Sequence, residues 1–308
     1  MIQPLVRVRD LRHAYGERVA LDGVSFEVGE GEIFGVLGPN GGGKTTMFRI
    51  LSTLLPVAAG HVEIAGADVG VDLAAVRRAI GVVFQSPSLD VKLTVRENLL
   101  CHGHLYGISG RDLSARVDKG LAALGLADRA DAFVETLSGG LQRRVELAKG
   151  LLSGPRILIL DEPSTGLDPG ARRDLWEYVL GLRRDHGTTV LVTTHLMDEA
   201  ERCDRLAILD RGHIVAVGTP DDLRSKIGGD VLTIRGGDLA AMGGEMKRRW
   251  GVEATTVDGC LRLEHRDARG LLREIYDAFP DSIESIQLAR PTLEDVFIHE
   301  TGHQLWNE

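Results

Sequence analysis

The sequence predicts an α/β protein with a mainly parallel sheet in its larger part and a small α+β module at its C-terminal end. Short apolar strands alternate with helical segments over most of the 308 residues, and this alternation is typical of a parallel sheet. We expect antiparallel strands at about residues 5–36 and an added block of helices at 94–152. The larger domain is placed at 3–225 and the C-terminal domain at 230–308, with Gly228-Gly229 marking the boundary.

The strands and helices of the larger domain follow from apolar runs and from cap signals. Buried strands are expected at 33–37, 80–84, 156–160 and 189–193, and a hairpin at 206–217. Helices are expected at 44–55, 94–105, 114–124, 138–152 and 168–184. Pro56 would end the first helix, Thr94 with Glu97 forms a capping box, and Asp168 precedes a proline at the first helical position.

The C-terminal domain has the element order strand, helix, strand, strand, helix, strand. Its strands are expected at 231–235, 253–257, 260–264 and 283–289, and its helices at 239–250 and 268–279. This order fits a ferredoxin-like module. A short terminal helix is expected from Thr292.

Composition excludes some classes of protein. The net charge of −9, from 36 basic and 45 acidic residues, argues against a nucleic-acid binder, which usually carries a basic excess. The three cysteines, Cys101, Cys203 and Cys260, form no Cys-x-x-Cys pair, so reduced thiols of a cytoplasmic protein are expected. No apolar run approaches the roughly 18 residues of a membrane helix, so we expect a soluble chain. In a transport system, another chain would have to supply the pore.

A glycine-rich segment between a predicted strand and a predicted helix carries the strongest chemical signal. It runs Gly38-Pro39-Asn40-Gly41-Gly42-Gly43-Lys44-Thr45-Thr46. The glycines allow a tight turn whose N–H groups point at phosphate oxygens, and the positive end of the following helix favours an anion. Lys44 would reach the β- and γ-phosphates, and the Thr45 hydroxyl would bind Mg²⁺. A chance glycine-rich turn is the alternative, but the strand before it and the helix after it favour phosphate binding.

Two carboxylates end the apolar run at residues 157–160. Asp161 would hold Mg²⁺ through water, and Glu162 would act as the general base that polarises the attacking water. Two acidic residues at the end of a strand usually form a solvated turn. The phosphate loop earlier in the chain favours the catalytic interpretation.

Leu137-Ser138-Gly139-Gly140 completes a set of motifs that resembles the ATP-binding cassette ATPases, which have the phosphate-loop NTPase fold. The resemblance implies a nucleotide-binding domain with an antiparallel β subdomain and an α-helical subdomain. It also implies that Ser138, Gly139 and Gly140 begin a helix that faces the γ-phosphate of a second copy, in a head-to-tail dimer around two ATP molecules. Leu141 stands where many members have Gln, which leaves the serine and the glycines intact.

Four further positions match the family. The resemblance implies that Gln85 contacts Mg²⁺ and senses the membrane partner, and that His195 touches the γ-phosphate. It implies that Asp168 belongs to the D-loop, and its role as a helix cap is compatible with that. Tyr15 would stack on adenine, and because stacking uses the ring face, this contact does not imply tight selection of ATP over GTP. Without the family context, a structural histidine and a tyrosine packed in a turn would be the simpler interpretations.

A second resemblance concerns the C-terminal part. Residues 290–297, Arg-Pro-Thr-Leu-Glu-Asp-Val-Phe, are similar to the C-terminal extension of drug-resistance ATPases of the daunorubicin-exporter type, and the segment from Gln85 to Gly107 adds to the likeness. Together, the two resemblances imply ATP and Mg²⁺ as cofactors and an integral membrane permease of the ABC-2 type as partner. They also imply a location on the cytoplasmic face of the cell membrane. The exported substrate would be a drug, an antibiotic or a lipid-like compound.

Other interpretations stay open. The main alternative is a soluble cassette ATPase acting on nucleic acid or ribosomes, although only about 90 residues separate the phosphate loop from residue 137, too few for long coiled-coil arms. An importer subunit is a further alternative. His102 and His104 lack further spaced ligands, so no metal site is expected there. Arg143-Arg144 and residues 247–249 are expected to be solvated helix faces.

Overall fold

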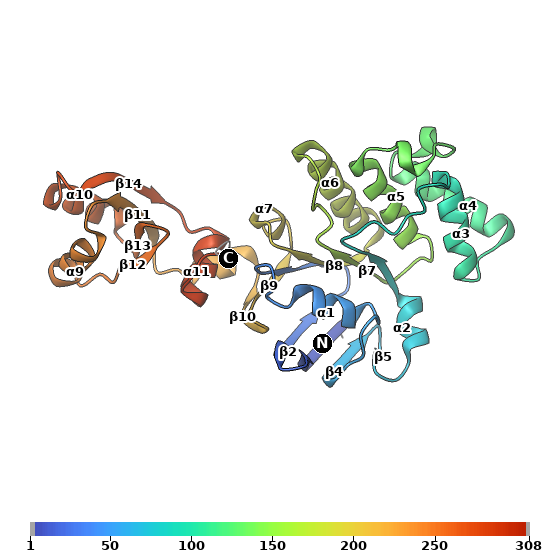
Figure 1. Cartoon of the computed structure of the whole chain (residues 1–308), viewed down its shortest axis with the longest axis horizontal. Helices are drawn as coiled ribbons and strands as arrows, with labels where there is room; N and C mark the ends of the chain where they lie inside the picture. Colours follow the sequence, from blue (N-terminus) through green and yellow to red (C-terminus); the bar gives the residue numbers. More distant parts are fainter. Residues whose placement is uncertain (1–3, 306–308) are drawn as a thin grey trace. The chain divides into compact units, whose positions relative to one another are not determined.

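The computed structural model describes residues 4–305 and divides the chain into two compact units, one up to Ile214 and one from Val215 (Figure 1). The division lies within strand β10 (His213–Gly218), upstream of the boundary expected at Gly228-Gly229. The domain limits of 3–225 and 230–308 remain a prediction, and residues 3 and 306–308 lie outside the described range.

An antiparallel sheet opens the larger unit, as expected. Its strand order is β2-β1-β4-β5, from β1 (Val6–Tyr15), β2 (Arg18–Val28), β4 (Ala59–Ile64) and β5 (Ala67–Asp68). Strand β1 pairs antiparallel with both β2 and β4. Its alternate residues Val6 and Val8 are buried, which gives this sheet one apolar face.

A mainly parallel sheet forms the centre of the larger unit. Its strand order is β10-β9-β3-β8-β7-β6, with β3 (Ile33–Leu37), β6 (Ile80–Val83), β7 (Ile157–Asp161), β8 (Thr189–Thr194) and β9 (Arg205–Asp210). The pairs β3–β8, β3–β9, β7–β8 and β6–β7 are parallel. Every residue of β3, β7 and β8 is buried, which explains why these strands are continuous apolar runs in the sequence.

Helices surround the parallel sheet and form a separate block after β6. They are α1 (Lys44–Leu51), α2 (Leu73–Ala79), α3 (Val95–Leu105), α4 (Gly110–Ala123), α5 (Gly139–Leu151), α6 (Pro169–His186) and α7 (Met197–Ala200), with 3₁₀ turns at Ala127–Arg129 and Val134–Thr136. Figure 1 shows α3, α4 and α5 grouped together beyond β7. Buried side chains of α3, α4, α5 and α6, among them Leu99, Leu113, Val145 and Trp176, share one core with β7 and β8.

Helix α1 ends earlier than the sequence predicts. A helix through residue 55 was expected, but α1 ends at Leu51 because Thr53 adopts the left-handed region with φ of 64°. The N–H groups of Leu54 and Leu55 then turn back and donate to the carbonyl of Arg49. The termination therefore occurs before Pro56, through a left-handed cap of the kind that commonly closes helices.

The second unit has its own sheet and core. After α8 (Pro220–Ser225) come β11 (Asp230–Gly236), α9 (Leu239–Trp250), β12 (Thr255–Val257), β13 (Cys260–His265), α10 (Ala268–Ala278), β14 (Ile283–Ala289) and α11 (Leu293–Thr301). The strand order is β12-β13-β11-β14, and neighbouring strands are antiparallel. Leu232, Met246 and Ile275 lie in its core. This arrangement confirms the expected ferredoxin-like module. Among the helices described, none combines the length and the apolar character needed to cross a bilayer.

Candidate functional site

Segments that follow neighbouring strands meet at one edge of the parallel sheet. The phosphate loop follows β3, and His195 comes directly after β8. Glu162 follows β7, and Gln85 follows β6 after one intervening residue. Because parallel strands end at the same edge, residues far apart in the sequence become neighbours there.

Two glycines of the phosphate loop are required by the backbone and by close packing. Gly43 has φ of 110°, and a Cβ there would lie 2.6 Å from the carbonyl oxygen of Ala20. A Cβ on Gly38 would lie 2.2 Å from the carbonyl oxygen of Leu209. Helix α1 then begins at Lys44, and its first N–H groups face the loop, so the loop and the helix start together form an anion site.

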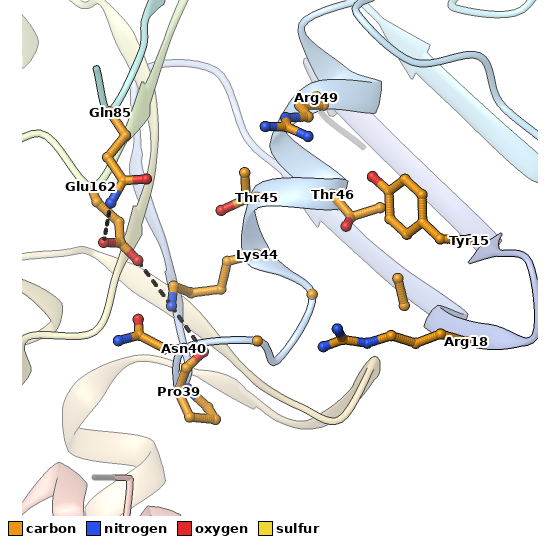
Figure 2. Close-up of a pocket in the computed structure, with 13 residues that line it drawn as sticks. Tyr15, Arg18, Pro39, Asn40, Lys44, Thr45, Thr46, Arg49, Gln85 and Glu162 are labelled. Carbon is orange, nitrogen blue, oxygen red and sulfur yellow. Dashed lines mark hydrogen bonds and ion pairs between the residues drawn. The ribbon is translucent and has the colours of Figure 1, made fainter. Parts of the chain in front are cut away.

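The Lys44 side chain is buried, with 3% of its surface exposed, and it folds back over the loop. Its Nζ donates to the carbonyl oxygens of Gly38 (2.9 Å) and Pro39 (3.0 Å). The same Nζ forms an ion pair of 3.0 Å with Oε1 of Glu162 (Figure 2). The cation of the phosphate loop and the carboxylate after β7 are therefore in direct contact.

Glu162 is the centre of the site. Its Oε2 accepts hydrogen bonds from Gln85 Nε2 and Thr165 Oγ1, both at 3.3 Å, and lies 3.1 Å from Nδ1 of His195. The residue has φ of 43°, an uncommon conformation for a side chain larger than glycine, and its N–H donates to the carbonyl of Thr193 (3.1 Å). Such strain is typical of functional positions that the surrounding structure holds in place.

The two carboxylates have opposite electrostatic environments. Burial opposes the ionisation of Glu162, but the hydrogen bond with His195 and the charge of Lys44 outweigh it and lower its pKa to about 2. Burial raises the pKa of Asp161, while the hydrogen bond from Thr193 Oγ1 (2.6 Å) opposes that rise. Glu162 is therefore a charged acceptor at neutral pH. Thr193 belongs to none of the sequence motifs, and its only signal is that of a polar residue at the end of an apolar strand.

A cavity of about 390 Å³ lies over the phosphate loop and contains most of the predicted cofactor-binding residues. The residues of the prediction that line it are Tyr15, Pro39, Asn40, Gly41, Gly43, Lys44, Thr45, Thr46, Gln85 and Glu162. Figure 2 shows Thr45 on the Gln85 side of α1 and Thr46 on the Tyr15 side. Tyr15 is 46% exposed, and its ring packs at a steep angle against the ring of His13, with the two ring centroids 4.9 Å apart.

Two basic residues of this cavity were missed by the sequence analysis. Arg18 and Arg49 line it together with Lys44. Arg18 begins β2, and Arg49 lies on α1 one turn beyond Thr45, so its spacing from the phosphate loop was the available signal. Together these cations complement a polyphosphate.

Other predicted residues lie elsewhere in the same unit. Ser138, Gly139, Gly140 and Asp168 are not among the described residues that line this cavity. Ser138 caps α5 and accepts from the N–H of Leu141 (3.4 Å). A Cβ on Gly140 would lie 2.8 Å from that of Ala171, so glycine allows α5 to pack closely on α6.

Asp168 caps α6 as the sequence indicated. Its Oδ1 accepts from the N–H groups of Gly170 (2.9 Å) and Ala171 (3.0 Å). The hydrogen bond from Ala171 contributes most to lowering the pKa of Asp168. This cap orients the first turn of α6, which packs against the start of α5 through Ala171 and Gly140.

The expectation of a solvated Arg143 is wrong. Its side chain is 5% exposed and forms an ion pair of 2.7 Å with Glu146. Arg144 lies closer to the surface, where it pairs with Asp174 and covers the ring of Tyr178. Helical spacing alone did not separate the two arginines, because the segment that covers Arg143 comes from the distant end of β6. Residues 247–249 in the second unit are solvated, as expected.

Comparison with known proteins agrees with this geometry. A family model described as ABC transporter matches residues 21–165. A daunorubicin resistance ATP-binding protein of Streptomyces coeruleorubidus is 39% identical over 98% of this chain and 97% of its own length. A Nod factor export ATP-binding protein of Paraburkholderia xenovorans is 39% identical over 99% of both chains.

A solved structure gives the same result for the larger unit. A dimeric ATP-binding cassette in a post-hydrolysis state, bound to ADP and Pi, is 30% identical and superposes with a TM-score of 0.63. The match covers 70% of this chain and 98% of that one. Taken with the full-length relatives, the phosphate loop and its carboxylates identify the chain as a nucleotide-binding ATPase of the ATP-binding cassette transporter family.

Proposed function

We propose that the chain is the ATP-hydrolysing subunit of an exporter, which couples ATP binding and hydrolysis to efflux of a drug or lipid-like compound through a separate membrane permease. The contact between Lys44 and Glu162, with Gln85 and His195 on the same carboxylate, carries this proposal. In this proposal, Lys44 is the phosphate-binding cation and Glu162, its ion-pair partner, is the group that activates water. The names of the full-length relatives, one for drug resistance and one for export, support the transport role.

Glu162 would act as general base and His195 would contact the γ-phosphate. A carboxylate with a pKa of about 2 is a weak base while it is paired with Lys44. A triphosphate in the phosphate loop would attract Lys44 toward its own oxygens, and the loss of that ion pair would raise the pKa of Glu162. Nucleotide binding would thereby prepare the base. Tyr15 would stack on the adenine ring.

The oxygen donors at this edge suit Mg²⁺. Thr45 and Gln85 line the cavity, and Asp161 lies buried at the end of β7, directly before Glu162, which lines the cavity too. Hydroxyl, amide and carboxylate oxygens are the ligands this hard cation prefers, and it commonly keeps several waters. Thr45, Gln85 and Asp161 would hold the ion, which would offset the negative charge of the phosphates.

A second copy of the chain would complete each site. Ser138, Gly139 and Gly140 form the N-terminus of α5, and none of the three lines the nucleotide cavity of the same chain. Such a terminus favours a phosphate group. In a head-to-tail dimer it would close on the nucleotide held by the phosphate loop of the other copy, and Asp168 would lie at that interface. The dimeric state of the solved cassette supports this arrangement.

The partner would be an integral membrane permease of the ABC-2 type, with this chain on the cytoplasmic face of the membrane. The segment that follows Gln85 carries exposed apolar side chains, including Val91, Leu105 and Tyr106. Leu105 is 84% exposed and its neighbour Tyr106 is 43% exposed, and contiguous exposed apolar side chains are typical of protein interaction sites. This surface would transmit the closure of the dimer to the permease.

Substitution of Glu162 by Gln tests the catalytic role. We expect ATP to bind, kcat to fall by about 100-fold or more because the general base is lost, and the chain to accumulate as a dimer with ATP. ATPase assays and size-exclusion chromatography measure both effects. The matched control is Glu177→Gln, at an exposed position of α6. Normal turnover by Glu162→Gln would remove Glu162 from the role of base.

Purification of the tagged chain from gently solubilised native membranes tests the transport role. A polytopic membrane protein recovered in stoichiometric amount would support the proposal and identify the chain that selects the substrate. Recovery from cytosol alone, with ribosomes or nucleic acid, would instead support the alternative of a soluble cassette ATPase.

A further inference from the structure

A buried ion pair lies on one face of α5, outside the nucleotide cavity. Arg143 and Glu146 are 5% and 3% exposed, and their charged atoms lie 2.7 Å apart. Burying such a pair is costly, and apolar side chains of the same size often stabilise a fold equally well. Arg143 and Glu146 also form hydrogen bonds with the segment that follows β6, which indicates a role beyond stabilising the fold.

Both members of the pair, with Lys149 on the next turn, bind the backbone that follows β6. Arg143 Nη1 donates to the carbonyl of Phe84 (2.6 Å), and its Nη2 donates to the carbonyl of Gln85 (3.1 Å). Glu146 Oε1 accepts from the N–H (2.6 Å) and the Oγ (3.1 Å) of Ser88. Lys149 Nζ donates to the carbonyl (2.6 Å) and the Oγ (2.8 Å) of Ser88.

The segment from Phe84 to Ser88 is therefore held at both ends by one helix. The carbonyl of Gln85 is one of the groups held by Arg143, while the side chain of Gln85 donates to Glu162 Oε2 (3.3 Å). Gln85 itself is exposed, so its own packing does little to restrain it. The hydrogen bonds from α5 supply the restraint, and α5 begins with Ser138.

We propose that Arg143 is a positioning residue which, with Glu146 and Lys149, attaches the backbone of Gln85 to α5, so that a displacement of α5 moves the Gln85 amide relative to Glu162. The inference rests on the proposed function in that Glu162 is taken as the base. A guanidinium with two donors in one plane suits this role, because it holds two successive carbonyl groups at once. The site after β7 is thereby coupled to α5, which begins at Gly139 with Ser138 as its cap.

Substitution of Arg143 by Gln tests the proposal, with Arg144→Gln as the matched control on the same helix. We expect Arg143→Gln to bind a fluorescent ATP analogue with nearly unchanged Kd, and to lose about 10- to 100-fold in kcat through misplacement of Gln85. Hydrogen exchange in peptides covering 84–90 should become faster. Arg144→Gln should keep the kcat and the exchange rates of the wild type.

Two further variants keep the test decisive if Arg143→Gln folds poorly. Arg143→Lys keeps the charge but can hold only part of the two-carbonyl contact, so an intermediate kcat is expected. Ser88→Ala, at an exposed position, removes only the hydroxyl contacts to Glu146 and Lys149 and should speed exchange at 84–90 with a smaller loss of kcat.

Wild-type kcat and exchange in the Arg143 variants would overturn the proposal, as would equal losses in Arg144→Gln. If Glu162→Gln abolishes turnover in the same assays, the proposed function stands and only the positioning role fails. Normal turnover by Glu162→Gln would instead refute the proposed function.

Discussion

The carboxyl edge of the parallel sheet and the start of α5 are both suited to phosphate, but they differ in completeness. At the sheet edge, Lys44, Glu162, Gln85 and His195 form one connected cluster around a cavity. At the start of α5, Ser138 caps the helix without any of these groups beside it among the contacts described. One region holds a full set of chemical groups, and the other holds a single helix terminus.

This difference shows why the chain needs a second copy to work as proposed. A helix N-terminus stabilises an anion modestly when it is exposed to water, and much more when it is enclosed. In the proposed function, the sheet edge would bind a nucleotide alone, whereas the start of α5 would act only when it closes on a nucleotide already held. Substitutions at the sheet edge should therefore weaken ATP binding, whereas substitutions at the start of α5 should lower kcat.

Lys44→Ala should give the largest effect on binding. It removes the cation of the phosphate loop, and the loss of a buried charge partner should weaken ATP binding by about 30-fold or more. Isothermal titration calorimetry with ATP and Mg²⁺ measures this. The control is Lys119→Ala, at an exposed position of α4. Unchanged affinity for ATP in Lys44→Ala would contradict the distinction between the two regions, because the sheet edge would then not be the primary binding region.

Ser138→Arg should affect turnover without affecting binding. A long charged side chain at the start of α5 blocks closure of the second copy, so kcat should fall about 10- to 100-fold through lost alignment while the Kd for ATP stays the same. ATPase rates and chromatographic dimer assays measure this. Ser109→Arg, at the start of α4, is the matched control. A rise in Kd as large as that of Lys44→Ala would show that the two regions are not separate.

His102→Gln should give the smallest effect, a change in the pH dependence of stability, because this residue lies in neither phosphate-binding region. Burial, with a smaller contribution from the charge of Lys149, lowers the pKa of His102 from 6.5 to about 4. Between these values the unfolded chain binds more protons, so the stability linked to this residue is intact above 6.5 and is lost as the pH falls toward 4. The decrease in Tm between about pH 7.5 and about pH 5 should be smaller in the variant than in the wild type. An equal decrease in both proteins would contradict the shift.

Local sequence signals predicted much of the fold. The cap at Thr94 and Glu97, the cap at Asp168 and the apolar runs of β7 and β8 depend on neighbouring residues, and these elements lie where they were expected. The end of α1 was missed because a left-handed Thr53 has no sequence signal comparable to glycine or proline. Helix α2 was also missed, although Asp72 caps it by accepting from the N–H of Ala75, because a seven-residue helix shows little apolar periodicity.

Predicting the site required a different kind of information. Family motifs marked Lys44, Glu162, Gln85 and His195. That the other three contact the Glu162 carboxylate depends on the order of β3, β8, β7 and β6 in the sheet. Thr193 carried only a weak signal, because a polar residue at the end of an apolar strand is common. Its hydrogen bond to Asp161 becomes visible only when β7 and β8 lie side by side.

By itself, the sequence determined the α/β class, the phosphate loop and the paired carboxylates, because each depends on residues close together in the chain. The tertiary structure decided which of two adjacent arginines is buried, since Arg143 meets the backbone of Phe84 and Gln85 only after β6 and α5 pack together. It also decided how far the pKa of Glu162 is lowered, because Lys44 at the start of α1 and His195 after β8 reach its carboxylate from distant parts of the sequence. Contacts between distant segments set burial and electrostatics, and no local pattern encodes them.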